Sequence, residues 1–163
     1  MKISRKVKTR ITKLFKGGKT IEDIMGAIRE DSPRTTATTI NQIIRKHLTD
    51  LADELWSTAV KLGGRCAISN RTTNLEAHHL IKRGNHAYRW DLNNGICLYC
   101  RTHGDAESDE AAFFLWLSKN KKAQWKWYQE HKDLEKCGRW VDNHALLEIC
   151  KELNTYINKN RRK

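Results

Sequence analysis

Apolar side chains recur at helical spacing through the first sixty residues of the chain, which predicts four helices. The first ends at Gly17, and the second opens at Thr20, whose spacing to Asp23 is that of a capping box. The third helix is expected to end near residue 48, and the fourth is expected around residues 51–62. The inward-facing residues of the four helices are, in order, Val7, Ile11, Leu14 and Phe15; Ile21, Ile24, Met25 and Ile28; Ile40, Ile43, Ile44 and Leu48; Leu51, Leu55, Ala59 and Leu62.

The third helix carries a polar and basic face opposite its apolar one. Three short helices with such a third helix resemble, in layout, a helix-turn-helix DNA reader, in which this face would enter the major groove. Arg45 and Lys46 would then contact nucleic acid. A small helical bundle that only packs on the rest of the protein is the alternative, because few three-helix layouts bind DNA. The polar face consists of Arg34, Thr35, Thr38, Thr39, Gln42, Arg45 and Lys46.

The middle of the chain differs from the first sixty residues, because it has short apolar runs separated by glycine and asparagine. Residues 75–81 and 95–99 are expected to form two short strands, joined by a polar loop over residues 82–93. Helical spacing returns after Ser108, and Asp142 is expected to cap a last helix. We therefore expect a mostly helical α+β fold in three regions: a helical region over residues 1–62, a core over residues 63–108 and packing helices over residues 109–163.

Charge narrows the range of partners. The 163 residues include 31 Lys and Arg against 19 Asp and Glu, giving a formal net charge of +12 and a pI near 9.7. This balance favours a polyanion such as nucleic acid, although ribosomal and membrane-surface proteins share it. A membrane span and a signal peptide are not expected, because the chain lacks an apolar run of the required length, which predicts a soluble, cytoplasmic protein. The five cysteines are an odd number, so thiols or metal ligands are expected instead of a disulfide framework.

The residues that carry chemistry are His78, His79, Asn94 and His103. Fourteen residues separate His79 from Asn94, and eight separate Asn94 from His103. This H-x14-N-x8-H pattern resembles that of the HNH endonucleases, over about forty residues from Cys66 to Glu107. The stretch 89–96, Arg-Trp-Asp-Leu-Asn-Asn-Gly-Ile, is similar to the loop that enters the second strand in phage-type members. The resemblance implies a ββα-metal core, in which two strands and a helix hold one divalent cation.

The resemblance also implies a role for each residue of the motif. His78 and His103 would be metal ligands, and His79 would be the general base that takes a proton from water. Adjacent residues of a strand face opposite sides, so His78 and His79 are not expected to point at one metal in the same way. Asn94 is counted with the catalytic residues and is expected to bond backbone across the loop, because its amide both donates and accepts.

Three more residues are candidates for this site. Glu107 lies one helical turn after His103 and would be a third metal ligand, although Gly104 between them disfavours a helix. Lys82 and Arg83 directly follow the first strand, where they would contact phosphate or remain exposed loop charges.

The cysteines depart from the pairs of C-x2-C that hold a structural zinc in many HNH proteins. Ser69 stands where a partner of Cys66 would be, and the second pair would fall at Tyr99 and Thr102. Structural zinc is therefore not expected, and the thiols are interpreted as small buried side chains. We interpret the C-x2-C pair Cys97 and Cys100 in this way. Cys137 and Cys150 are expected to be core or surface residues.

These observations predict a metal-dependent DNA endonuclease that hydrolyses phosphodiester bonds and leaves a 5′-phosphate. The similarity of residues 89–96 to phage-type members suggests a phage-encoded enzyme that acts in the host bacterial cytoplasm. The expected partner is DNA and not a membrane, and the expected cation is Mg, Mn, Ni or Zn. A non-catalytic DNA-binding regulator with a structural metal site is the alternative, and an RNA-binding protein is a third possibility that rests on charge alone. The target, the choice between a nick and a double-strand break, the biological role and the oligomeric state stay open.

Overall fold

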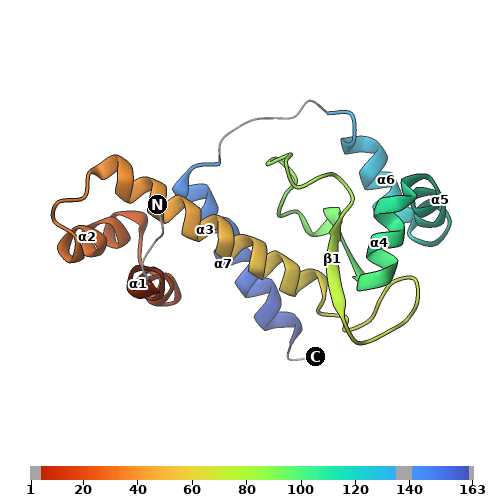
Figure 1. Cartoon of the computed structure of the whole chain (residues 1–163), viewed down its shortest axis with the longest axis horizontal. Helices are drawn as coiled ribbons and strands as arrows, with labels where there is room; N and C mark the ends of the chain where they lie inside the picture. The colour runs from red at the N-terminus through yellow and green to blue at the C-terminus, as the bar shows by residue number, and fades with distance from the viewer. Residues whose placement is uncertain (1–4, 135–140, 162–163) are drawn as a thin grey trace. The chain divides into compact units, whose positions relative to one another are not determined.

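The structure, a computed structural model, describes residues 5–134 and 141–161 (Figure 1). It is a mostly helical α+β fold with one small sheet, as the sequence predicts. Among the described residues, no helix combines the length and apolar character needed to cross a bilayer. The elements are α1 (Arg5–Lys16), α2 (Ile21–Asp31), α3 (Ala37–Val60), β1 (Leu75–His79), the 3-10 helix η1 (Leu92–Asn94), β2 (Gly95–Tyr99), α4 (Cys100–Ser108), α5 (Glu110–Asn120), α6 (Lys122–His131) and α7 (Asn143–Asn160).

The chain folds as two compact units, which are described separately. The first unit contains Met1–Glu54 and Val141–Asn154, and the second contains Leu55–Trp140 and Thr155–Lys163. This division differs from the three expected regions, because the start of α7 groups with the N-terminal helices.

The first unit is a helical bundle whose core is built from the predicted apolar stripes. The predicted capping box is present at the start of α2, where Thr20 and Asp23 bond each other's backbone N–H. Asp142 caps α7 as expected, accepting from the Ala145 N–H at 2.8 Å. The buried residues of the unit are Ile11, Phe15, Ile21, Ile24, Ile28, Ile40, Ile44, Leu48, Ala52, Leu146, Leu147, Cys150 and Leu153.

The expected third and fourth helices are one continuous helix, α3, so the predicted break near residue 50 is wrong. No glycine or proline lies between Ala37 and Val60, and buried residues continue at a spacing of four from Ile44 through Leu48 and Ala52 to Trp56. The apolar stripe of α3 therefore continues past residue 50, where no helix-ending residue lies.

The second unit is built around an antiparallel hairpin of β1 and β2, in the segments where the sequence predicts strands. His79 pairs with Gly95, and His78 pairs with Ile96. The unit also contains helices α4, α5 and α6 and the last turns of α3 and α7, and α4 follows β2 directly. The core cluster consists of Cys66, Leu80, Ile96, Leu98, Ala106, Phe113 and Leu117.

Gly95 allows the end of α3 to pack closely on β2. A Cβ atom at this position would overlap the Val60 side chain and would lie 2.8 Å from Cζ2 of Trp56. We expect Gly95→Ala to lower the free energy of unfolding by about 1–3 kcal/mol, because both neighbours are held in place by packing. Urea unfolding followed by tryptophan fluorescence would measure this, since the five tryptophans among the described residues belong to the second unit. Gly63→Ala, with open space around the new Cβ, is the matched control; equal stability of the two variants would contradict the expectation.

Candidate metal centre

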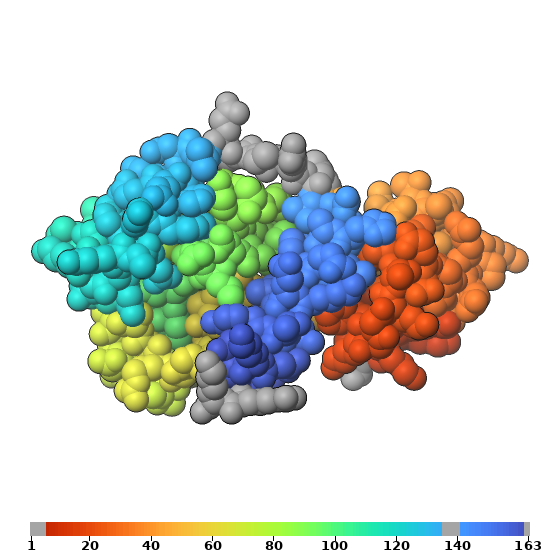
Figure 2. Space-filling view, turned by 180° about the vertical axis from the view of Figure 1, so that it is seen from behind, coloured from red at the N-terminus to blue at the C-terminus, as the bar shows by residue number. Residues whose placement is uncertain are grey.

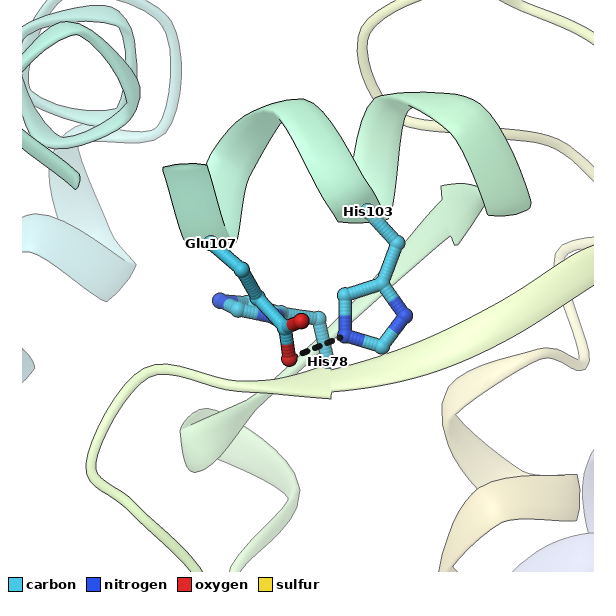
Figure 3. Close-up of side chains that lie close together, drawn as sticks. All are labelled: His78, His103 and Glu107. Atoms are coloured by element: carbon cyan, nitrogen blue, oxygen red, sulfur yellow. Dashed lines mark ion pairs between the residues drawn. The ribbon is translucent and has the colours of Figure 1, made fainter. Parts of the chain in front are cut away.

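The hairpin and α4 bring two histidines and a glutamate together. His78 comes from β1, and His103 and Glu107 come from successive turns of α4 (Figure 3). Their nitrogen and carboxylate oxygen atoms all lie within 4.8 Å of one another. Gly104 does not interrupt α4, so Glu107 lies one turn after His103, with its Oε1 atom 3.4 Å from Nε2 of His103. Among the described residues, this is the one group of such side chains that is close enough to hold a metal ion.

His78 is kept uncharged by its surroundings. Its ring packs edge-on against His103, with centroids 4.8 Å apart, and against Phe113 at 5.2 Å. Burial and the neighbouring His103 lower the pKa of His78 to about 4. A neutral imidazole keeps the nitrogen lone pair that a metal ligand needs, so His78 is ready to coordinate at neutral pH.

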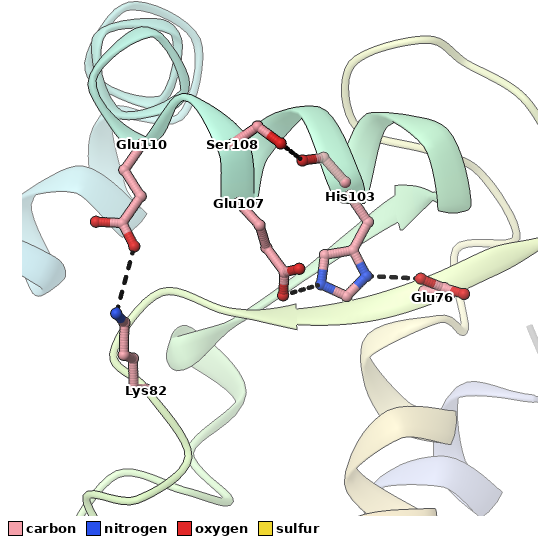
Figure 4. Close-up of polar contacts among 7 residues, drawn as sticks. Glu76, Lys82, His103, Glu107, Ser108 and Glu110 are labelled. Atoms are coloured by element: carbon pink, nitrogen blue, oxygen red, sulfur yellow. Dashed lines mark hydrogen bonds and ion pairs between the residues drawn. The ribbon is translucent and has the colours of Figure 1, made fainter.

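Glu76 orients the second histidine. Its Oε2 atom lies 2.6 Å from Nδ1 of His103, on the opposite side of the ring from Glu107 (Figure 4). A carboxylate that accepts from one ring nitrogen leaves the other nitrogen, here Nε2, as the metal-binding atom, and it makes that atom more basic. The sequence-based prediction gives Glu76 no role. The available signal is its position two residues before His78, which places both on one face of β1.

These three side chains fit a divalent cation. Two imidazoles and one carboxylate are a common donor set for Zn, Ni and Mn, and they leave coordination positions for water and substrate. Glu76 completes the arrangement by supplying the hydrogen-bond partner that metal-bound histidines almost always have.

His79 faces away from this cluster, as the alternation of strand side chains predicts. Its ring stacks on the indole of Trp56, with centroids 3.8 Å apart and planes 13° apart. Its Nε2 atom lies 3.0 Å from the Arg89 carbonyl oxygen, which accepts a hydrogen bond from the ring. Trp56 is 3% exposed, and its own N–H donates to the Asp91 carbonyl at 2.9 Å, so the stacking partner is itself fixed. Trp56 lies on α3, outside the motif, and no local pattern in the sequence points to it.

Asn94 bonds backbone across the loop between the strands, as expected. It is fully buried, and its Oδ1 atom accepts from the Ile81 N–H at 2.6 Å. Its amide nitrogen donates to the carbonyls of Ile81 and Tyr88, at 3.0 and 2.9 Å. All three hydrogen bonds join the Asn94 side chain to backbone groups just after β1 and in the loop that follows. Asn94 therefore fixes the loop and does not hold a reacting atom.

The four predicted nucleic-acid contacts lie in different surroundings. Lys82 is 90% exposed and lies 3.6 Å from Glu110 (Figure 4), and Arg83 is exposed in the same loop. Arg45 donates to the Val141 carbonyl at 2.6 Å, and Lys46 pairs with Asp50 at 3.3 Å. The two α3 side chains therefore make contacts within the first unit.

The described cysteines are free thiols. Cys66, Cys97 and Cys150 are buried, and Cys100 is half-buried at the start of α4. The Ser69 N–H donates to the Cys66 sulfur at 3.3 Å, in the turn where a C-x2-C pair would stand. Burial raises the pKa of Cys97, and it raises that of Cys150 to about 12, so both are protonated at neutral pH. Cys137 lies outside the described residues.

Comparison of the chain with protein-family models, with curated proteins and with solved structures found no match.

Proposed function

We propose that this protein is a metal-dependent DNA endonuclease of the HNH type, with residues 75–108 as its ββα-metal core. One observation carries the proposal. A cluster of two histidines and a glutamate lies on one side of β1, and a separately fixed imidazole, His79, lies on the other. One-metal hydrolysis of a phosphodiester can use a cation site together with a base that does not bind the cation.

In this proposal His78, His103 and Glu107 hold one divalent cation, and Glu76 orients His103. When bound there, the cation would stabilise the charge that develops on the phosphate and on the departing 3′-oxygen. The neutral state of His78 and the carboxylate behind His103 support this assignment.

His79 would activate the attacking water. Because a carbonyl oxygen only accepts, the contact with Arg89 places the ring proton on Nε2 and the lone pair on Nδ1. The water oxygen would attack phosphorus while one of its protons passes to Nδ1. The bond from phosphorus to the 3′-oxygen then breaks, and that oxygen takes a proton from solvent, which leaves a 5′-phosphate and a 3′-hydroxyl. Trp56 would keep the imidazole plane fixed during this transfer.

A cleavage panel tests the proposal. The full chain is incubated with supercoiled plasmid, linear duplex, branched DNA or single-stranded DNA, in Mg²⁺, Mn²⁺, Ni²⁺, Zn²⁺ or EDTA. We expect cleavage of at least one DNA with at least one cation, no cleavage in EDTA, and product ends that carry a 5′-phosphate. If no combination is cut although the protein binds DNA and metal, the enzyme proposal is wrong, and the non-catalytic DNA-binding regulator replaces it.

Glu76 gives a test that does not depend on cleavage. We expect Glu76→Gln to weaken cation binding about tenfold, because an amide does not supply the negative charge that makes the His103 ring a stronger ligand. Isothermal titration with Mn²⁺ or Zn²⁺ measures the change. Glu130→Gln removes a similarly exposed carboxylate that pairs with Lys126 and serves as the control. Equal cation affinities for the two variants would show that Glu76 does not act on the site.

A further inference from the structure

Helix α1 carries a cationic surface that the proposed cleavage chemistry does not use. Lys6 and Lys13 lie two turns apart on one side of α1, and Lys19 follows in the turn after it. All three are exposed, and together they line an open groove of about 880 Å³. The segment that carries them is coloured at the red end of the bar in Figure 2. We call Lys6, Lys13 and Lys19 the α1 basic surface.

Carboxylates do not neutralise this surface. Among the described residues, the three lysines take part in no ion pair, and no acidic side chain lines the groove. Arg10, which lines the same groove, differs because it pairs with Glu30 at 3.3 Å and with Asp31 at 2.6 Å. Three unpaired cations around one groove make a local positive potential that favours an anionic partner.

The apolar side of α1 excludes a partner that needs apolar insertion. Ile11 is fully buried and Phe15 is 7% exposed, both within the core of the first unit. An amphipathic helix that inserts into a membrane surface instead offers its apolar face to the lipid. These two apolar side chains are therefore not available to a partner, and the lysine ammonium groups add positive charge around a groove that Leu14 also lines.

The spacing of the lysines suits a phosphate backbone. Lys13 lies seven positions after Lys6 along the helix, about 10 Å at 1.5 Å per residue, which is the axial length of about three nucleotides. By contrast, Arg45 and Lys46 of α3 bond to groups of their own unit. The three lysines of the α1 basic surface instead have no carboxylate partner among the described residues and lie around one groove.

We propose that the α1 basic surface binds the phosphate backbone of DNA, independently of base sequence and outside the candidate metal centre. The choice of DNA among polyanions rests on the proposed endonuclease function. The surface would hold the substrate while the hairpin and α4 act on it, so its contribution should appear in affinity and in salt dependence.

The test is metal-free DNA binding by the full chain. A fluorescent 25-base-pair duplex is titrated in EDTA at several KCl concentrations, with the triple variant Lys6→Gln/Lys13→Gln/Lys19→Gln. The matched control is Lys126→Gln/Lys132→Gln/Lys151→Gln, which removes the same charge from three lysines that pair with carboxylates. Circular dichroism melting of both variants verifies that they fold.

We expect the α1 variant to bind DNA tenfold to a hundredfold more weakly than wild type near 150 mM salt, with a slope of log K against log salt that is smaller by about 2–3. The control should change much less. Equal losses in the two variants would assign the effect to net charge, and an unchanged α1 variant would show that DNA does not contact this surface; either result overturns the proposal.

Two further measurements distinguish this proposal from membrane binding and from the endonuclease proposal. Tighter, α1-dependent binding to vesicles of 30% phosphatidylserine in phosphatidylcholine than to DNA would overturn the choice of DNA. Because binding is measured in EDTA, α1-dependent DNA binding without any cleavage in the metal panel would support this proposal while contradicting the endonuclease.

Discussion

Replacement of His79 by alanine is expected to reduce DNA cleavage about 100- to 10,000-fold, the range that a positioned general base contributes. His79 is the imidazole of the hairpin that faces away from the cation cluster, and its ring is fixed by Trp56 and the Arg89 carbonyl. His78, His103 and Glu107 stay in place in this variant. Single-turnover cleavage of plasmid DNA in the cation that the panel selects measures the loss.

The same variant separates a base from a ligand. We expect His79→Ala to bind Mn²⁺ or Zn²⁺ and metal-free DNA within about threefold of wild type, whereas His103→Ala should lose cation binding as well as cleavage, because it removes a ligand. His144→Ala, at an exposed histidine of the first unit, is the control and should cleave normally. Cleavage by His79→Ala at the wild-type rate would remove His79 from the mechanism.

The hairpin could be predicted from the sequence because its signals are local. The predicted bounds of β1 and β2 lie within two residues of the observed ones. They follow from the alternating apolar runs, from the asparagine and glycine residues between them and from the loop length. The break within α3 was predicted where no glycine or proline supports one, and the apolar stripe continues through it to Trp56. A helix ends where its sequence or its packing stops it, and neither does so near residue 50.

The candidate site was predictable only as far as the motif extends. His78, His79, Asn94 and His103 stand out by spacing, and Glu107 by one helical turn. Glu76 could have been found from the period of two in a strand. Trp56 is different, because its stacking on His79 arises from the packing of α3 on the hairpin, more than twenty residues away along the chain.

The pairing of the charged side chains could not be predicted from the sequence either. The sequence gives the number of lysines and arginines, but not which of them are paired. Arg45 and Lys46 look like DNA contacts on a polar helix face, yet in the structure they bond to Val141 and Asp50. Lys6, Lys13 and Lys19 have no carboxylate partner among the described residues, and this difference supports the proposal for α1.

Asn94→Ala is expected to lower the free energy of unfolding of the second unit by about 3–5 kcal/mol. The side chain is fully buried, and its three bonds are to the N–H and carbonyl of Ile81 and to the carbonyl of Tyr88. Alanine leaves these groups without the partner that they have in the native loop, at about 1–3 kcal/mol for each group that stays buried. Urea unfolding followed by tryptophan fluorescence measures the change, and cleavage should fall with it because the loop carries the Arg89 carbonyl that orients His79.

Asn94→Asp separates the loss of bonds from the loss of volume. It keeps the oxygen that accepts from Ile81, but it turns a second oxygen toward two carbonyl oxygens in a fully buried position. Burial and these oxygens should raise the pKa of the introduced carboxyl in the folded state above its unfolded value near 4. Below that value both states are protonated, and the protonated carboxyl can donate to a carbonyl. As the pH rises above the unfolded pKa, the unfolded state ionises while the folded state stays protonated, so stability is lost until the pH has passed the raised folded pKa.

The stability deficit of Asn94→Asp should therefore widen from about pH 4 toward pH 7, whereas the deficit of Asn94→Ala should stay constant. The difference between the two variants, measured at each pH, cancels the titration of the other groups. Asn93→Ala is the control, because this exposed neighbour bonds only the Asp91 side chain through its amide and should change stability little. If the Asn94→Asp deficit does not depend on pH, the two carbonyls do not face this side chain, and Asn94 holds the loop by packing alone.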